Sequence, residues 1–232
     1  VGVIARFSSF FGPALAAAGI LDAREAFREN PTGLLQLMDR LLSRQERVMR
    51  VVCDRFGSEL ALVMVTENVA NSGGLVLDPD LFRSVFAHRL ERLVAAAKDH
   101  GKLLLMHSRG KVTEFLPILY EAGFNAVHPL EPEFHDILQV RATWAGRLAL
   151  VGNVPTALLI NGSRSQIEES VRSLCTRLAP GGGYVLSSSA GIAPEMPPAN
   201  FVAMVQAAHS YGRYQSLGHE SMGKLNGKDK GG

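Results

Sequence analysis

Six short runs of apolar residues recur along the chain, and each is followed by a segment with helical spacing. The runs are continuous rather than alternating, so the strands they form must be covered on both faces, which is typical of a parallel sheet. They span Val1–Arg6, Leu60–Thr66, Lys102–His107, Asn125–Pro129, Arg147–Asn153 and Tyr184–Ser188. About six repeats of strand and helix indicate an α/β protein, either a doubly wound sheet or a (β/α)8 barrel.

Local start signals place several of the helices. Asn30-Pro31 and Asp78-Pro79 each combine an N-cap residue with a proline at the first helical position. Ser165 and Glu168 have the spacing of a capping box and predict the start of a later helix.

Composition excludes several classes of protein. Lys and Arg number 24 against 22 Asp and Glu, so the net charge of +2 disfavours a dedicated nucleic-acid binder. No apolar run approaches the roughly 20 residues of a membrane helix. Neither a Gly-x-Gly-x-x-Gly motif after the first strand nor a Walker sequence is present, which disfavours a nucleotide-binding doubly wound fold. Without a signal segment, we expect a cytoplasmic protein.

Polar residues follow the apolar runs, where the active sites of parallel α/β folds lie. We predict Glu67, Asn68 and His107 as catalytic residues, although either of the first two could simply cap a loop. Candidate substrate-binding residues at the same strand ends are Arg6, Arg109, Glu131, Asn153 and Ser188. An arginine fork suits a carboxylate, so the expected substrate is a small carboxylated molecule. His128 also ends a strand, but its position before Pro129 favours a structural role.

The remaining histidines and the cysteines give little support for a metal site. Zinc requires three or four converging ligands. His107, Glu67 and Glu131 could form such a set, but no cysteine pair supports it, and Cys53 and Cys175 fit buried, reduced thiols. The other histidines lie on predicted helices, at helix ends or in the tail and are expected in solvent: His88, His100, His135, His209 and His219.

Several segments of the chain carry a resemblance to a known family. The most specific one is Gly191–Asn200, continuing to Tyr211–Tyr214. The others are Gly74–Phe82, His107–Gly110, Ala122–Ala126, Leu150–Val154 and Gly182–Leu186. In their order and spacing, the sequence resembles the uroporphyrinogen decarboxylase superfamily, which holds haem-pathway decarboxylases and zinc-dependent, corrinoid-linked methyltransferases. The resemblance implies a (β/α)8 TIM-type barrel over residues 1–214.

The departures from the family pattern bear on the activity. The methyltransferase branch has a His-x-Cys-Gly zinc pair, but here Arg109 follows His107 in the place of the cysteine. Ala190 stands where that branch has a later cysteine and where the decarboxylase branch has a nearby histidine. Glu67 corresponds to the central acidic group of the decarboxylases. The resemblance therefore implies decarboxylation of a porphyrinogen or similar substrate without a cofactor.

Two alternatives stay open. One is a methyltransferase-like protein with a corrinoid partner and a zinc held by His107, Glu67 and Glu131. The other is a barrel that binds a ligand or partner without catalysing a reaction. A homodimer is also left open by the sequence.

Chain length adds a further expectation. A (β/α)8 barrel typically needs about 250 residues, whereas this chain has 232, of which residues 215–232 have the composition of a flexible tail. Val1 already lies in a predicted strand, and six repeats leave an eight-stranded barrel with open edges. We therefore expect the N-terminal part of the barrel, including the family's Arg-bearing substrate loop, to be missing, and the isolated chain to be inactive if that loop is required.

Overall fold

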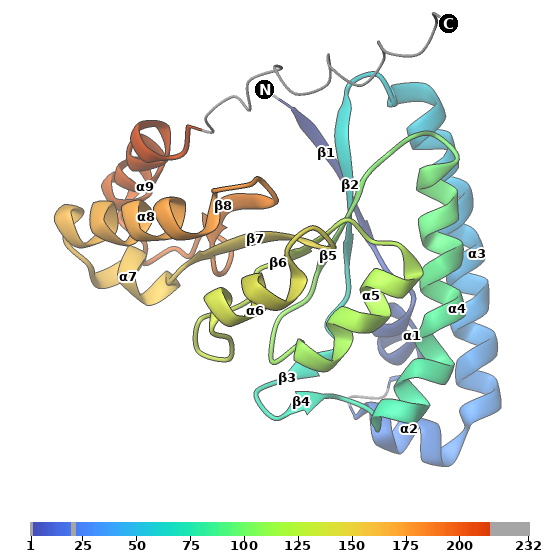
Figure 1. Ribbon diagram of the computed structural model, residues 1–232. Helices are drawn as coiled ribbons and strands as arrows, with labels where there is room; N and C mark the ends of the chain where they lie inside the picture. The colour runs from blue at the N-terminus through green and yellow to red at the C-terminus, as the bar shows by residue number, and fades with distance from the viewer. Residues whose placement is uncertain (1, 20–21, 214–232) are drawn as a thin grey trace, which may run out of the picture.

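The computed structural model describes residues 2–19 and 22–213, and its main feature is a parallel sheet (Figure 1). Six strands pair in parallel in the order β1-β2-β5-β6-β7-β8. They are β1 (Val3–Ser8), β2 (Leu60–Thr66), β5 (Leu104–His107), β6 (Ala126–His128), β7 (Ala149–Val154) and β8 (Tyr184–Ser188). All six apolar runs thus form strands, and the predicted α/β fold is confirmed.

The strand order distinguishes the two predicted architectures. Sheet neighbours are also successive strands along the chain, which is the order of a barrel, whereas a doubly wound sheet reverses its order at a switch point. Figure 1 shows the strand direction turning steadily from β1 and β2 to β7. Within the described residues, β1 and β8 are the two edges of this sheet.

Helices cover the outer face of the sheet along its whole width (Figure 1). The helices are α1 (Phe11–Ala18), α2 (Ala23–Glu29), α3 (Pro31–Phe56), α4 (Pro79–Lys98), α5 (Leu116–Ala122), α6 (Ile137–Trp144), α7 (Thr156–Asn161), α8 (Arg164–Leu178) and α9 (Pro198–Tyr211). A 3₁₀ turn, η1 (Thr113–Phe115), precedes α5. After β2, a short antiparallel hairpin pairs β3 (Ala70–Asn71) with β4 (Gly74–Leu75).

The two cap-plus-proline predictions are confirmed, while the predicted capping box is wrong. Asn30 accepts a hydrogen bond from the Gly33 amide at 2.9 Å, and Asp78 accepts one from the Asp80 amide at 3.1 Å. The capping box lies two residues earlier than predicted, on Ser163 and Gln166. Ser163 is extended and the helix begins directly after it, so the side chain of Ser163 is the one that reaches the free amides.

Two hydrophobic cores hold the layers together. The larger one lies between the sheet and α1 to α6, and it includes a stacked pair, Phe82 and Phe86, with ring centroids 4.1 Å apart. The smaller one joins the end of β7 to α7, α8 and α9 through side chains such as Val171 and Met204. Removal of these apolar side chains from water supplies the main stabilisation of the fold.

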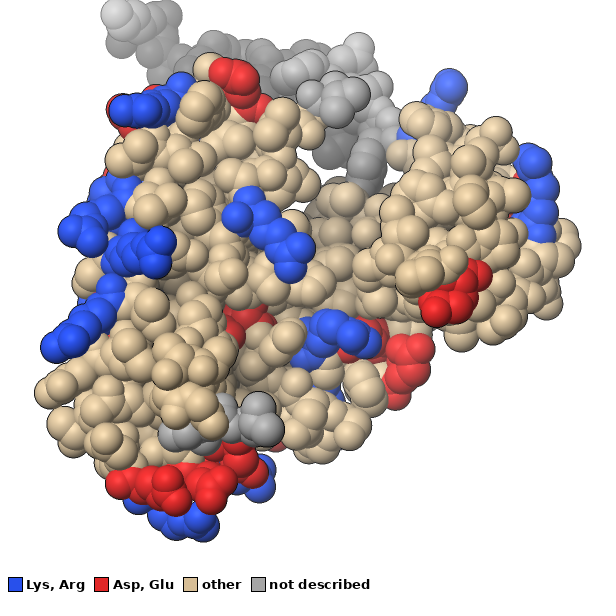
Figure 2. Space-filling view, turned by 180° about the vertical axis from the view of Figure 1, so that it is seen from behind, with Lys and Arg blue, Asp and Glu red and all other residues tan. Residues whose placement is uncertain are grey.

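Charged side chains are unevenly distributed over the surface. Lys and Arg gather along the flank of α3 and α4 (Figure 2), where acidic partners neutralise several of them. The best-buried of these pairs joins Arg89 to Asp39 through two contacts of 2.9 Å between α4 and α3. Among residues 2–19 and 22–213, no helix has the length and apolarity needed to cross a membrane. The predicted flexible tail, 215–232, lies outside the described residues.

We expect the contact between Gly110 and the β3–β4 hairpin to be sensitive to a single methyl group. Gly110 has a φ of +85°, and an added Cβ would lie 2.7 Å from the backbone carbonyl of Ala70. Gly181 has a similar φ of +80° with nothing within 4 Å of an added Cβ. Gly181→Ala should therefore cost only the backbone strain, about 1 kcal/mol of unfolding free energy. Gly110→Ala adds the steric clash and should cost about 2–4 kcal/mol.

Urea denaturation of the two variants beside the unmodified chain measures this difference. Equal losses of unfolding free energy in Gly110→Ala and Gly181→Ala would contradict the packing of the hairpin against Gly110.

Candidate functional site

The parallel register brings polar residues from four strands into one row at their carboxyl ends. Ser8 pairs with Thr66, Thr66 with His107, and His107 with His128. Side chains at paired positions of neighbouring strands point to the same face of a sheet. Because β1, β2, β5 and β6 are far apart in sequence, this row exists only in the folded chain. It forms the centre of the candidate site.

The two histidines of this row are in direct contact. Nδ1 of His107 lies 2.8 Å from Nδ1 of His128, and the ring centroids are 5.0 Å apart. Nε2 of His128 lies 3.3 Å from the backbone carbonyl oxygen of Ser188 on β8. Burial lowers the pKa of His128 to about 4, with a further contribution from His107. His128 is therefore neutral near pH 7.

Two arginines act on His107. The Nε of Arg6 donates to Thr66 Oγ1 at 3.0 Å, and the Nε of Arg109 donates to Glu131 Oε1 at 2.9 Å. Both arginine side chains are exposed, and that of Arg109 is 61% accessible. Burial lowers the pKa of His107, and the positive charges of Arg6 and Arg109 lower it further. A neutral imidazole with two nearby cations results.

Glu131 is a buried anchor for Arg109 and its loop. Besides the ion pair, Glu131 Oε2 accepts the Gly110 amide at 2.6 Å, so both carboxylate oxygens are occupied. The prediction that His135 faces solvent is wrong, because its ring is buried. His135 Nδ1 bonds to the Glu131 carbonyl at 3.1 Å, and its Nε2 accepts the Val112 amide at 3.2 Å. These contacts brace the turn that carries Glu131.

Glu67 lies at the end of β2, next to the row, but its carboxyl group points at the start of α1. The amides of Phe11 and Gly12 donate to its two oxygens at 2.8 and 3.0 Å. The side chain is buried, with 3% of the residue exposed. Burial raises its pKa to about 7, although the Gly12 and Phe11 amides favour the charged form. Glu67 thus exchanges its proton near neutral pH.

The other predicted site residues lie around this centre. Asn153 is buried, and its amide donates to the Leu130 carbonyl at 2.8 Å, which ties β7 to the loop after β6. Ser188 meets the row through its backbone carbonyl, which accepts from His128. Asn68 is exposed and lines a separate cleft of about 420 Å³ beside α1, together with Asp22, Arg24 and Asn71. The structure thus separates Asn68 from the histidine pair.

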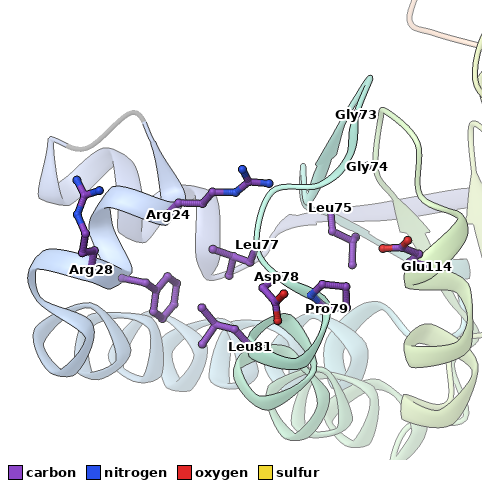
Figure 3. Close-up of a pocket in the computed structure, with 11 residues that line it drawn as sticks. Arg24, Arg28, Gly73, Gly74, Leu75, Leu77, Asp78, Pro79, Leu81 and Glu114 are labelled. Carbon is purple, nitrogen blue, oxygen red and sulfur yellow. The ribbon is translucent and has the colours of Figure 1, made fainter.

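A larger cleft, of about 620 Å³, opens between α2, the β3–β4 hairpin and the start of α4. Figure 3 shows Arg28 and Glu114 at its opposite ends, with Leu77, Pro79 and Leu81 between them. Arg24 lines both this cleft and the one beside α1. None of the predicted site residues lines the larger cleft, so size alone does not identify the polar centre.

The donor set does not fit the zinc of the methyltransferases. Within residues 2–19 and 22–213, no group of three His, Cys, Asp or Glu side chains is arranged to hold a metal ion. Glu67 and Glu131 direct their oxygens at backbone amides and Arg109, so the alternative set with His107 does not converge. Cys53 and Cys175 are buried on α3 and α8, and burial raises the pKa of both thiols.

Replacement of Glu67 by Gln should change how stability depends on pH. The folded-state pKa of about 7 exceeds the ordinary value of 4.5, so the folded chain binds the extra proton and its stabilisation is lost as pH rises through 7. Glutamine lacks this titration. Between pH 5 and pH 8 the unfolding free energy of the unmodified chain should therefore fall relative to that of Glu67→Gln, by about 2.5 kcal/mol.

Chemical denaturation of both proteins at the two pH values tests this. Other titrating groups, such as His128, are common to both proteins and cancel in the difference. Parallel pH profiles would show that Glu67 titrates normally.

Comparisons with known proteins place the chain in a family. The model of the uroporphyrinogen decarboxylase family matches residues 8–211. A methylcobamide:CoM methyltransferase of Methanosarcina barkeri is 28% identical over 137 residues, which are 59% of this chain and 38% of the relative. A uroporphyrinogen decarboxylase of Idiomarina loihiensis is 34% identical over 76 residues, 33% of this chain and 21% of the relative.

The fold is shared with a solved methyltransferase from Methanosarcina mazei, with a TM-score of 0.70 and 20% identity over 91% of this chain and 59% of that one. The aligned regions span at most 38% of the length of these two curated relatives. Because the family model covers most of the residues, the predicted superfamily is confirmed: the chain belongs to the uroporphyrinogen decarboxylase family.

Proposed function

We propose that the chain carries the site of a decarboxylase of the uroporphyrinogen decarboxylase type, acting without metal or cofactor on a small molecule with several carboxylates. The main observation behind this proposal is that two exposed guanidinium groups, those of Arg6 and Arg109, lower the pKa of His107 and keep its imidazole neutral. A substrate with one reacting and at least one further carboxylate complements such an arrangement. Charge-assisted bonds from arginine to carboxylate are among the strongest in proteins.

Arginine at position 109 favours this reaction over methyl transfer. In the zinc-dependent relatives that position is expected to carry a thiolate, which binds a metal and activates a thiol. A guanidinium group in its place repels a metal cation and attracts an anion. Glu131 holds Arg109 at the edge of the site, where the side chain of Arg109 stays exposed to solvent.

The proposed reaction uses Glu67 as a charge-stabilising carboxylate and His107 as a base. A proton from solvent adds to a ring carbon of the pyrrole, which makes the ring an electron sink, and the buried negative charge of Glu67 stabilises the resulting cation. The bond to the carboxylate then breaks, its electron pair forms an exocyclic double bond, and carbon dioxide leaves. A proton from water converts the exocyclic carbon to a methyl group, and Nε2 of His107 removes the proton from the ring carbon. In total, one carboxylate and one proton yield carbon dioxide and a C–H bond.

The remaining predicted residues are proposed to assist this reaction. Asn68 stays a proposal as a catalytic residue and Ser188 as a substrate-binding residue, whereas Glu131 and Asn153 assist by holding Arg109 and the loop after β6. The backbone amide of Glu67 donates to the backbone carbonyl of His107 at 2.9 Å, so Glu67 lies beside the end of β5. A pKa of about 7 leaves Glu67 partly ionised at neutral pH, and a cation formed close to it favours the ionised form.

Turnover of chemically reduced uroporphyrinogen, followed by mass spectrometry of the decarboxylated products, tests the proposal. His107→Asn keeps a donor toward His128 but removes the Nε2 base, so kcat should fall about 100-fold. Arg6→Gln removes one guanidinium group and should raise KM about tenfold. Glu67→Gln removes the negative charge that stabilises the ring cation and should lower kcat by a similar 100-fold.

Arg172→Gln is the matched control, because Arg172 is an exposed cation on α8 that forms an ion pair with Glu169 on the same helix. It should leave kcat and KM unchanged. Unchanged turnover in Glu67→Gln and His107→Asn would refute their roles. Stoichiometric zinc in the purified protein would favour the methyltransferase alternative, and binding of the porphyrinogen without turnover would favour the non-catalytic one.

A further inference from the structure

The contacts of the histidine pair determine which nitrogens carry protons. The carbonyl oxygen of Ser188 can only accept a hydrogen bond, so the Nε2 of His128, 3.3 Å away, carries a hydrogen. A neutral imidazole has one N–H, so Nδ1 of His128 is an acceptor. The 2.8 Å contact between the two Nδ1 atoms then requires that Nδ1 of His107 be the donor. Both rings keep this order only while both are neutral.

Nε2 of His107 is consequently the one imidazole nitrogen of the pair that keeps a free lone pair. Within the described residues, that atom makes no hydrogen bond. The ring is half-buried, whereas the neighbouring Arg6 and Arg109 are exposed. A lone pair at this position can accept a proton from a bound molecule, and the tautomer that provides it depends on a partner at Nδ1.

We propose that His128 is a positioning residue that, anchored by the Ser188 carbonyl, holds His107 in the Nδ1–H tautomer and so keeps the Nε2 lone pair of His107 available for proton transfer. The role in turnover rests on the function proposed above, whereas the tautomer is a property of the free chain. The sequence favours a structural role for His128, because its pairing with His107 on β5 arises only in the sheet register.

A series of hydrogen bonds from Ser188 through His128 to His107 connects the ends of three strands. Ser188 ends β8, His128 ends β6 and His107 ends β5. The Ser188 carbonyl accepts from Nε2–H of His128, and Nδ1 of His128 accepts from Nδ1–H of His107. Rotating either ring would break one of these bonds in a half-buried environment, where an unpaired polar group costs free energy. The ring orientations are therefore fixed together with the tautomers.

Two substitutions at position 128 separate the positioning role from simple packing. His128→Asn places an amide oxygen near the position of Nδ1 and so retains an acceptor for His107. His128→Leu has a similar volume but no acceptor. Nitrogen chemical shifts of the histidine rings, measured by long-range nitrogen–proton correlation on the labelled full chain at pH 7.5, report the tautomer without any substrate.

In the unmodified chain and in His128→Asn, His107 should be protonated at Nδ1. In His128→Leu, its Nε2–H form should become populated. His135 is an internal reference, since its Nδ1–H faces the Glu131 carbonyl and its Nε2 accepts the Val112 amide. Its shifts should stay constant in all three proteins, which also reports that the fold around the site is retained.

In turnover assays, His128→Leu should lower kcat at least tenfold with little change in KM, and His128→Asn should return kcat to within about threefold of the original. An Nε2–H tautomer of His107 in the unmodified chain, or no tautomer change in His128→Leu, would overturn the proposal. The expected tautomers together with a His107→Asn variant of normal kcat would instead refute the function proposed above and leave the positioning intact.

Discussion

The parallel register of the strands is the constraint on which the candidate site depends. Thr66, His107 and His128 end three strands and pair directly across the sheet. Side chains alternate between the two faces of a strand, so a shift of one residue in any pairing would send one of these groups to the helix-covered face. The apolar residues before them fix that register, because Val63, Val65, Met106 and Val127 are buried.

Polar groups at the strand ends fall into two sets with different tasks. Glu67, Glu131 and Asn153 are buried and direct their side chains at backbone groups, so they hold the loops after β1, β5 and β6 in place. Arg6 and Arg109 are exposed beside His107 and retain charge that faces solvent. The first set satisfies buried donors and acceptors, as an interior must, and the second is available to a ligand. The ion pair between Arg109 and Glu131 connects the two sets.

How much of this could be predicted from sequence depended on the range of the interactions. The caps at Asn30 and Asp78 were predicted because each acts on amides two or three residues away. Helix α1 gives no such signal, because its N-cap residue, Phe10, has no capping side chain and the first amides bond instead to Glu67, directly after β2. The burial of His135 was missed for a similar reason. Its two ring partners come from the turn before α6 and from the loop before η1.

The sequence by itself determined the layers: continuous apolar runs predict a parallel sheet, and the helical segments between them cover its outer face. It also determined which residues end each strand, and hence which polar groups could form a site. The tertiary structure alone decided which of these groups meet. It joined His107 to His128, bound Arg109 to Glu131 and turned Glu67 toward α1. Such pairings depend on strand order and on hydrogen bonds between distant segments, whereas sequence patterns report only the neighbours along the chain.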